Sequence, residues 1–307
     1  METRRTSAAK PDWPELQLAA WRGTRETVHR WLQVVGKVRL SLTPLINHWW
    51  NVTLYVSPRG LTTSTIPYGD RWFEIELDLL DDVMRITTSD GASRGVVLAP
   101  RSVADFYRET MTQLRSLGID CHIWTTPVEI EDPIPFERDD VHRDYDKAYV
   151  VRWWRILALT TAILTKFRAR FIGKASPVHF FWGTFDLATN RYSGRRAPPV
   201  EGNLIEREAY SHETSAVGWW PGDARLETPA FFSYFAPEPA GFRDAKISTP
   251  GAYYHPTLKG FYLPYEDLRA AADPEAMLLE FCQQTYAAGA DLAQWNHAEL
   301  ERPHMRP

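Results

Sequence analysis

Two segments of this chain recur further along it without gaps, and this repetition restricts the possible folds more than any other feature of the sequence. A shift of 131 residues aligns residues 36–50 with residues 167–181. A second shift, of 171 residues, aligns residues 102–124 with residues 273–295. A repeated block is a supersecondary unit that buries its apolar face against a neighbouring unit. We therefore expect the chain to consist of two tandem copies of one unit.

The periodicities within these copies predict their secondary structure. Apolar residues at helical spacing predict helices over residues 24–40 and 147–171. Alternation of apolar and polar residues predicts strands over residues 48–57, 72–80 and 83–88. Helical patterns preceded by an N-cap residue close both copies: Ser102 before residues 103–117, and Asp273 before residues 275–295.

The predicted fold class is α+β, with each copy built as helix, antiparallel strands, helix. The copies span residues 13–126 and 147–297, and the acidic, proline-containing segment 127–146 is the expected solvated linker. An antiparallel sheet of half the length would leave an edge and a face uncovered. We therefore predict that two pseudo-symmetric copies pack together and that residues 1–307 form a single compact unit.

Charge and cysteine content exclude several classes of protein. The net charge of −4 gives no electrostatic basis for nucleic-acid binding. Two cysteines are too few for a disulfide framework or a cysteine-rich zinc site. The longest apolar run, residues 156–164, is too short to cross a membrane, and the N-terminus lacks the apolar region of a signal peptide. We expect a cytoplasmic protein without nucleic-acid or membrane partners.

Tryptophan is unusually frequent, with 13 residues in a chain of 307. Large rings fill a wide hydrophobic core, and they also form the walls of ligand pockets. The sequence leaves both interpretations open.

Histidine is the first candidate for chemistry because its ordinary pKa lies near neutrality. His48 and His179 occupy equivalent positions in the two copies, each at the start of a predicted strand and on its apolar face. A pseudo-twofold axis would either bring the two histidines to one central site or leave them at two separate positions with only structural roles. His212 and Glu213 follow in the second copy, but no metal-binding spacing connects the histidines. A three-histidine metal site is therefore a weaker alternative.

Basic residues near these histidines are candidates for holding an anion, because the guanidinium group matches carboxylate and phosphate geometry. Arg39 and Arg170 match in the two copies and stand nine residues before the matching histidines. A solvated basic surface is the alternative interpretation. The predicted binding residues are Arg39, Arg170, Lys174, Arg191, Arg195 and Glu213.

The second copy also contains sequence that the first copy lacks, across residues 190–250. Residues 183–199 form a polar segment bounded by glycine and proline, which we interpret as a loop, and long ordered loops are commonly functional. We predict that the additional sequence is the wall or lid of a pocket with Arg170, Lys174 and His179 on its floor. A surface excursion is the alternative.

Longer motifs give the chain a family resemblance. They include FRARFIGKASPVHFFWG at residues 167–183, YSHE at residues 210–213 and GWWPG at residues 218–222. On these motifs the sequence resembles, from Trp13 to Trp295, a bacterial family catalogued only as a domain of unknown function. The resemblance implies no reaction, cofactor or catalytic residue.

The predicted function is an enzyme that acts on a small anionic metabolite, with or without an aromatic ring. His179 is the first candidate for the general acid or base, His48 is its counterpart and His212 is the next. A non-catalytic small-molecule binder, a histidine-ligated metal enzyme and a protein–protein interaction module are the alternatives. The sequence identifies no cofactor and no oligomeric state.

Overall fold

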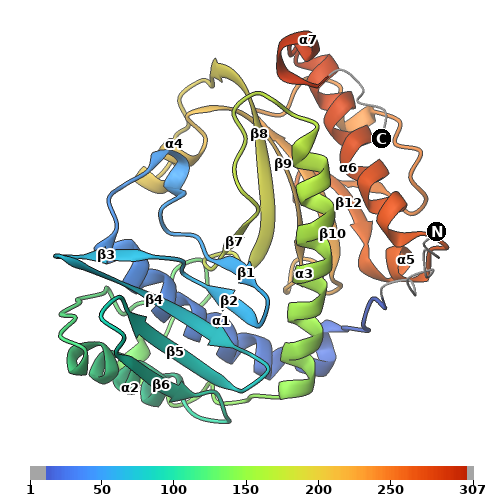
Figure 1. Cartoon of the computed structure of the whole chain (residues 1–307). Coiled ribbons are helices and arrows are strands. Elements are labelled where there is room, and N and C mark those ends of the chain that lie inside the picture. The colour runs from blue at the N-terminus through green and yellow to red at the C-terminus, as the bar shows by residue number, and fades with distance from the viewer. Residues whose placement is uncertain (1–11, 303–307) are drawn as a thin grey trace, which may run out of the picture.

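The structure, a computed structural model, describes residues 12–302 as a mixed α+β fold with seven α-helices and two antiparallel sheets (Figure 1). The α-helices are α1 (Leu18–Leu42), α2 (Val103–Ser116), α3 (Lys147–Ala169), α4 (Leu204–Ala209), α5 (Tyr265–Ala270), α6 (Pro274–Leu292) and α7 (His297–Leu300). Short 3-10 helices are η1 (Asn47–Trp49), η2 (Phe136–Arg138) and η3 (Phe242–Asp244). No helix in this part of the chain combines the length and apolar character needed to cross a bilayer.

Each sheet contains six strands. The first sheet consists of β1 (Tyr55–Ser57), β2 (Gly60–Thr62), β3 (Ile66–Tyr68), β4 (Arg71–Asp78), β5 (Val83–Thr88) and β6 (Ser93–Val97). Its order is β1-β2-β4-β5-β6, and β3 pairs with β4. The second sheet consists of β7 (His179–Phe181), β8 (Asp186–Arg196), β9 (His212–Trp220), β10 (Ala230–Ala236), β11 (Tyr253–His255) and β12 (Gly260–Pro264). Its order is β11-β12-β10-β9-β8-β7.

Helix α3 connects the two sheets. It contacts β1 of the first sheet and β8 and β9 of the second. In Figure 1 it stands upright in front of the second sheet, with the first sheet at the lower left. Helix α6 packs against β9 and β10, so α3 and α6 contact neighbouring strands of the second sheet.

The two sheets meet at their edge strands. Leu54 and Phe180 form an antiparallel bridge, with backbone N···O distances of 2.9 and 2.8 Å. The indole N–H of Trp182 donates to the carbonyl oxygen of Val52 at 2.7 Å. His29 of α1 donates to the carbonyl oxygen of Trp182 at 3.0 Å. These contacts connect the segment around β7 to the segment before β1 and to α1.

One hydrophobic core runs through both halves. The Trp31 and Phe106 rings of the first half stack with centroids 4.7 Å apart, and the Trp153 and Phe185 rings of the second half stack at 5.0 Å. Most of the tryptophan content therefore fills the core. The tryptophans buried in this core are Trp13, Trp21, Trp31, Trp153, Trp182, Trp219 and Trp295. Trp220 is buried in a smaller cluster formed by residues of the second sheet.

Several local predictions are confirmed. Helix α1 includes the helix predicted over residues 24–40, and α3 ends two residues before the one predicted over residues 147–171. Strand β4 ends two residues before the strand predicted over residues 72–80, and β5 matches the one predicted over residues 83–88. The Ser102 side chain accepts a hydrogen bond from the backbone N–H of Asp105, and Asp273 accepts one from that of Ala276. Gly118, with φ of 71°, ends α2.

The strand predicted over residues 48–57 is wrong for most of its length. His48 and Trp49 have φ angles of 59° and 60°, and two left-handed residues interrupt an extended strand. The backbone N–H of His48 donates to a Glu208 carboxylate oxygen and not to a neighbouring strand. Only β1 remains of the prediction.

The loop predicted over residues 183–199 is also wrong, because β8 occupies most of it. β8 is an interior strand that pairs with β7 on one side and β9 on the other. Its polar side chains find partners within the fold, as where Asn190 donates to the hydroxyl of Thr214 at 3.2 Å. The polar composition of residues 183–199 is typical of a loop, but here it belongs to an interior strand.

The segment 127–146 is less solvated than predicted. Phe136 and Asp139 are each 0% exposed. The Asp139 carboxylate lies 3.3 Å from Nε of Arg30 and 2.8 Å from Nδ1 of His142. Burial of one ring and one paired carboxylate makes this connection part of the packed structure.

Both halves place a six-stranded antiparallel sheet after a long helix. The matching histidines nevertheless stand in different local structures, His48 in a 3-10 helix and His179 at the start of a strand. The tandem pseudo-symmetry therefore remains a prediction.

Gly36 of α1 provides a test of the packing between the halves. A Cβ atom at Gly36 would lie 2.3 Å from Nε1 of Trp182, whose position is fixed by its bond to Val52. We expect Gly36→Ala to lower the free energy of unfolding by about 1–3 kcal/mol, as overpacking does. Urea denaturation measures this change.

Gly23→Ala is the matched control, in the same helix. Its Cβ would meet the carboxylate of the exposed Asp144, at the far end of a side chain that can move. Alanine also has the higher helix propensity, so we expect the control to keep or gain stability. Equal losses in both variants would contradict the packing argument.

Candidate functional site

His48 ties the loop after α1 to the second half of the chain. Its Nδ1–H donates to the carbonyl oxygen of Ala209 at 3.0 Å. A carbonyl oxygen only accepts, so Nδ1 carries the proton and Nε2 is an acceptor. Nε2 receives a hydrogen bond from the ammonium group of Lys174 at 2.7 Å. The His48 backbone N–H donates to Glu208 at 3.2 Å, which fixes η1 against the end of α4.

Lys174 lies between two aromatic rings. Its ammonium nitrogen is 5.0 Å from the ring centroid of Tyr192 and 5.5 Å from that of Trp50, both within cation–π range. Burial lowers the pKa of Lys174, and the nearby Glu208 carboxylate opposes this shift. Burial also lowers the pKa of His48, and the positive charge of Lys174 acts in the same direction. Lys174 therefore keeps the proton, and His48 is a neutral acceptor.

His179 is completely enclosed at the start of β7, with 0% exposure. Its Nε2 lies 3.5 Å from the hydroxyl of Tyr55, and its Nδ1 has no hydrogen-bond partner within residues 12–302. Burial lowers the pKa of His179 to about 3, and the charges of Arg39 and Arg168 act in the same direction. This environment favours the neutral form of His179. Its assignment as the general acid or base remains a prediction.

Trp50 connects the two matching histidines. Its ring centroid lies 5.4 Å from that of His48 and 6.1 Å from that of His179. Tyr192 stacks on His48 at 4.5 Å, and His212 packs edge-on against His48 at 5.6 Å. The structure thus gathers the three predicted histidines in one place. We call His48, Trp50, Lys174, His179, Tyr192 and His212 the junction cluster.

Two arginines approach the junction cluster from the ends of long helices. Arg39 of α1 is 8% exposed and donates from Nε to the carbonyl oxygen of Asn51 at 2.6 Å. Its guanidinium carbon lies 5.6 Å from the ring centroid of Tyr55. Arg168 of α3 donates from Nε to the carbonyl oxygen of Ser176 at 2.5 Å. Among the described residues, neither arginine forms an ion pair with a carboxylate.

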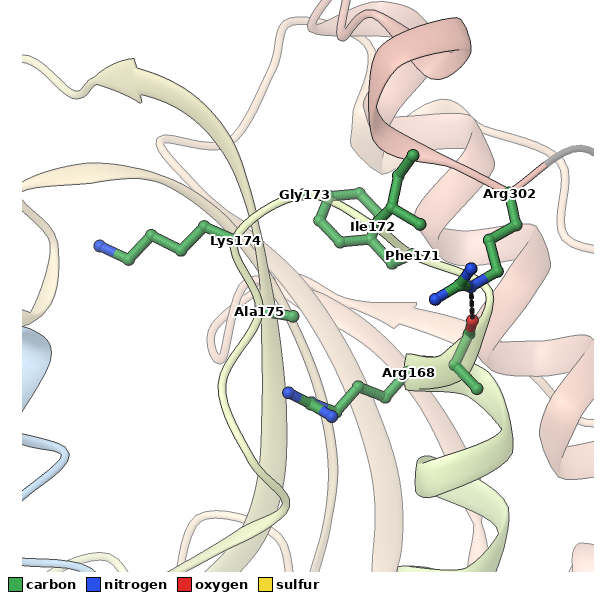
Figure 2. Close-up of a pocket in the computed structure, with 8 residues that line it drawn as sticks. Arg168, Phe171, Ile172, Gly173, Lys174, Ala175 and Arg302 are labelled. Atoms are coloured by element: carbon green, nitrogen blue, oxygen red, sulfur yellow. Dashed lines mark hydrogen bonds between the residues drawn. The ribbon is translucent and has the colours of Figure 1, made fainter.

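A groove with a volume of about 670 Å³ opens along the segment between α3 and β7 (Figure 2). Figure 2 shows the side chains of Arg168 and Lys174 extending to the same side of this segment. Arg302 lies on the other side and donates to the carbonyl oxygen of Ala169 at 3.0 Å. Three cations and no acid line the groove, together with the apolar and glycine residues Ala169, Phe171, Ile172, Gly173 and Ala175.

Four of the predicted binding residues, Arg170, Arg191, Arg195 and Glu213, lie outside the junction cluster. Arg170 is exposed just after α3. Arg191 is buried 3.5 Å from the ring centroid of Phe167, and burial lowers its pKa to about 10. Arg195 forms an ion pair with Glu213 at 2.7 Å and donates to the backbone at the end of α6. Arg191, Arg195 and Glu213 therefore have partners within the protein, and Arg170 lies at the surface.

Sequence reasoning missed Arg168, Trp50 and Tyr55. Arg168 has a signal in the self-match, where it aligns with another base, Lys37. Residues two apart on a helix differ by about 200° in direction, so only one of Arg168 and Arg170 can face the junction. Tyr55 has no local signal, because its contact with His179 joins residues 124 positions apart.

The other predictions for the site have mixed support. Helix α4, within the additional segment 190–250, does contact η1, although its action as a lid remains a prediction. Within residues 12–302, no group of three or more histidine, cysteine, aspartate or glutamate side chains could hold a metal ion.

Comparisons with known proteins give a family and nothing more specific. A family model described as "Family of unknown function (DUF5996)" matches residues 13–302. This confirms the resemblance seen in the sequence motifs. No curated protein and no solved structure matches the chain.

Two enclosed histidines predict how stability depends on pH. Burial is the main cause that lowers the pKa of His29 and of His179 from 6.5 to about 3. Between these values each is neutral in the folded protein and protonated in the unfolded chain. The free energy of unfolding should therefore fall as the pH falls from 6.5 toward 3, by about 1.4 kcal/mol per pH unit for each histidine.

Urea denaturation between pH 4.5 and 6.5 measures this slope. His179→Gln should reduce it by about 1.4 kcal/mol per pH unit, and His29→Gln should do the same. An unchanged slope in His179→Gln would show that His179 titrates alike in the folded and unfolded protein.

Proposed function

Because the chain belongs to DUF5996, a family of unknown function, its function must be inferred from its own chemistry, and we propose that it binds a small anionic ligand in the groove beside Arg168 and Lys174. The observation that carries this proposal is the charge of the lining: Arg168, Lys174 and Arg302 are present and carboxylates are not. Guanidinium and ammonium groups in such a setting favour an anion of matching geometry.

Lys174 and Arg168 each have N–H donors that are not used by the hydrogen bonds to His48 and Ser176. An ammonium group has three N–H donors, and one of those on Lys174 points to His48. Arg168 uses Nε for Ser176 and has two further nitrogens that can hold a carboxylate or phosphate as a fork. The rings of Trp50 and Tyr192 keep Lys174 in position between them. Each of these two side chains can therefore donate to a carboxylate or phosphate oxygen.

An acid–base enzyme is the second candidate, and the bond between His48 and Lys174 favours it. Ala209 fixes the tautomer of His48, so its Nε2 can accept a proton from a bound ligand. Burial lowers the pKa of Lys174, which moves its amine closer to the range of a general base. In this version His48 and Lys174 act on the ligand, and Arg168 holds it.

Two other hypotheses from the sequence have less support. An interaction module would display a broad exposed aromatic patch, but most of the tryptophans are buried. Gene duplication remains a hypothesis for the origin of the two halves, supported by the similar order of their elements.

Anion binding can be tested with inorganic phosphate and acetate as probes. We expect Arg168→Gln to weaken binding about tenfold, because a charge-assisted hydrogen bond contributes about 1.5–3 kcal/mol. Arg170→Gln is the matched control, with the same change of charge two residues away on an exposed side chain. Isothermal titration calorimetry measures both. Equal effects of the two changes would indicate non-specific attraction and reject the groove.

The enzyme hypothesis predicts an unusually reactive amine at Lys174. Competitive labelling with an amine reagent across pH 7–11, read by peptide mass spectrometry, should give a midpoint for Lys174 below the ordinary value of 10.5. The cause is burial of the ammonium group. A midpoint at or above 10.5 would argue against an acid–base role for Lys174.

A further inference from the structure

We propose that the ligand of the groove is an amphiphilic anion, with one acidic group at Arg168 and Lys174 and an apolar chain along Ile172. This inference rests on the proposed anion-binding function and adds the chemistry of the rest of the ligand. A carboxylate with a straight alkyl chain is the simplest ligand of this class.

The lining of the groove is apolar between its cations. Five of its eight residues are apolar or glycine, and Figure 2 shows Phe171 and Ile172 between Lys174 on one side and Arg302 on the other. None of the eight is acidic. The groove therefore offers an apolar surface next to groups that attract an anion.

Ile172 supplies the main observation. It is 51% exposed, whereas the neighbouring Phe171 is 6% exposed and belongs to the hydrophobic core. Single exposed apolar side chains are common on protein surfaces, but Ile172 lines a groove. Covering it with a ligand chain would remove apolar surface from water, which is favourable.

The volume of the groove exceeds what an acidic group needs. At about 670 Å³ it falls within the range of about 300–1,000 Å³ that is usual for small-molecule sites. Acetate or phosphate bound at Arg168 and Lys174 would fill a small part of this volume and leave Ile172 in water. A ligand with an attached chain would fill more of the groove and cover Ile172.

The backbone keeps Ile172 and Lys174 at fixed positions. The backbone N–H of Ile172 donates to the carbonyl oxygen of Leu300 at 2.7 Å, and the carbonyl oxygen of Lys174 accepts from the backbone N–H of Tyr192 at 3.0 Å. A Cβ atom at Gly173 would lie 2.5 Å from Cδ2 of Leu300, so these segments are closely packed. A binding surface that is already ordered lowers the entropic cost of holding a ligand.

Calorimetric titration of the full chain with acetate, butyrate and hexanoate tests the inference, because these anions share one carboxylate and differ only in the chain. Hexanoate should bind at least ten times more tightly than acetate, with butyrate between them. This gain is about 1.4 kcal/mol, less than half of what complete burial of the additional methylene groups would give. Hexanamide, which has the same chain and no charge, should bind at least ten times more weakly than hexanoate.

Ile172→Gln tests the position of the chain, because it replaces an apolar side chain with a polar one of similar length. We expect hexanoate to lose most of its advantage over acetate in this variant, while the affinity for acetate stays unchanged. Leu292→Gln is the matched control, because Leu292 is 45% exposed at the end of α6 and lies outside the lining of the groove. It should leave the advantage of hexanoate intact.

The outcomes separate this inference from the proposed function. Equal affinities for the three carboxylates, with Arg168 still required, would overturn the apolar chain and leave the anion site. A hexanoate advantage that survives Ile172→Gln would overturn the placement of the chain. Absence of binding for every carboxylate, or equally tight binding of hexanamide, would overturn both proposals.

A spectroscopic readout locates the chain without a comparison of variants. In protein labelled at isoleucine methyl groups, hexanoate should shift the methyl resonance of Ile172, assigned with Ile172→Gln, and acetate at equal occupancy should shift it much less. An unshifted Ile172 resonance with hexanoate bound would contradict the inference.

Discussion

A pair of backbone hydrogen bonds between Leu54 and Phe180 links the two halves of the chain beside the junction cluster. It joins the edge strands of the two sheets, at 2.9 and 2.8 Å. Neighbouring residues on a strand face opposite sides, so Phe180 enters the core while His179 faces Tyr55 and Trp50. The hydrogen bond from Trp182 to Val52 reinforces this pairing in the same segment.

The parts of the fold that could be predicted depend on local signals. Ser102 and Asp273 cap their helices through bonds to residues three positions away, and the alternation in β4 and β5 reflects one buried face. The parts that could not be predicted depend on distant partners. The left-handed conformation of His48 is held by Glu208, 160 positions away, and the polar residues of β8 look like a loop until β7 and β9 enclose them.

The candidate site also has residues that the sequence could predict and residues that it could not. The repeat in the sequence predicted His48 and His179 as candidate residues, and both contact Trp50. It paired Arg39 with Arg170, whereas the charge of Arg168 is the one that acts on His179. The alignment fixes only positions along the chain, while the direction of a side chain depends on the helical turn and on what packs against it. Chemical roles depend on hydrogen-bond partners, such as Ala209 for His48, which no pattern in the sequence reveals.

The hydrophobic core shared by the two halves has a thermodynamic consequence. Because the same buried cluster includes Trp31 and Val35 of α1 and Phe281 and Tyr286 of α6, neither sheet can lose its packing without exposing part of the other's. We therefore expect the two sheets to unfold together. Any molecule held at the joint is therefore linked to the folding equilibrium of both sheets, and at a hundred times its dissociation constant it stabilises them together by about 2.7 kcal/mol.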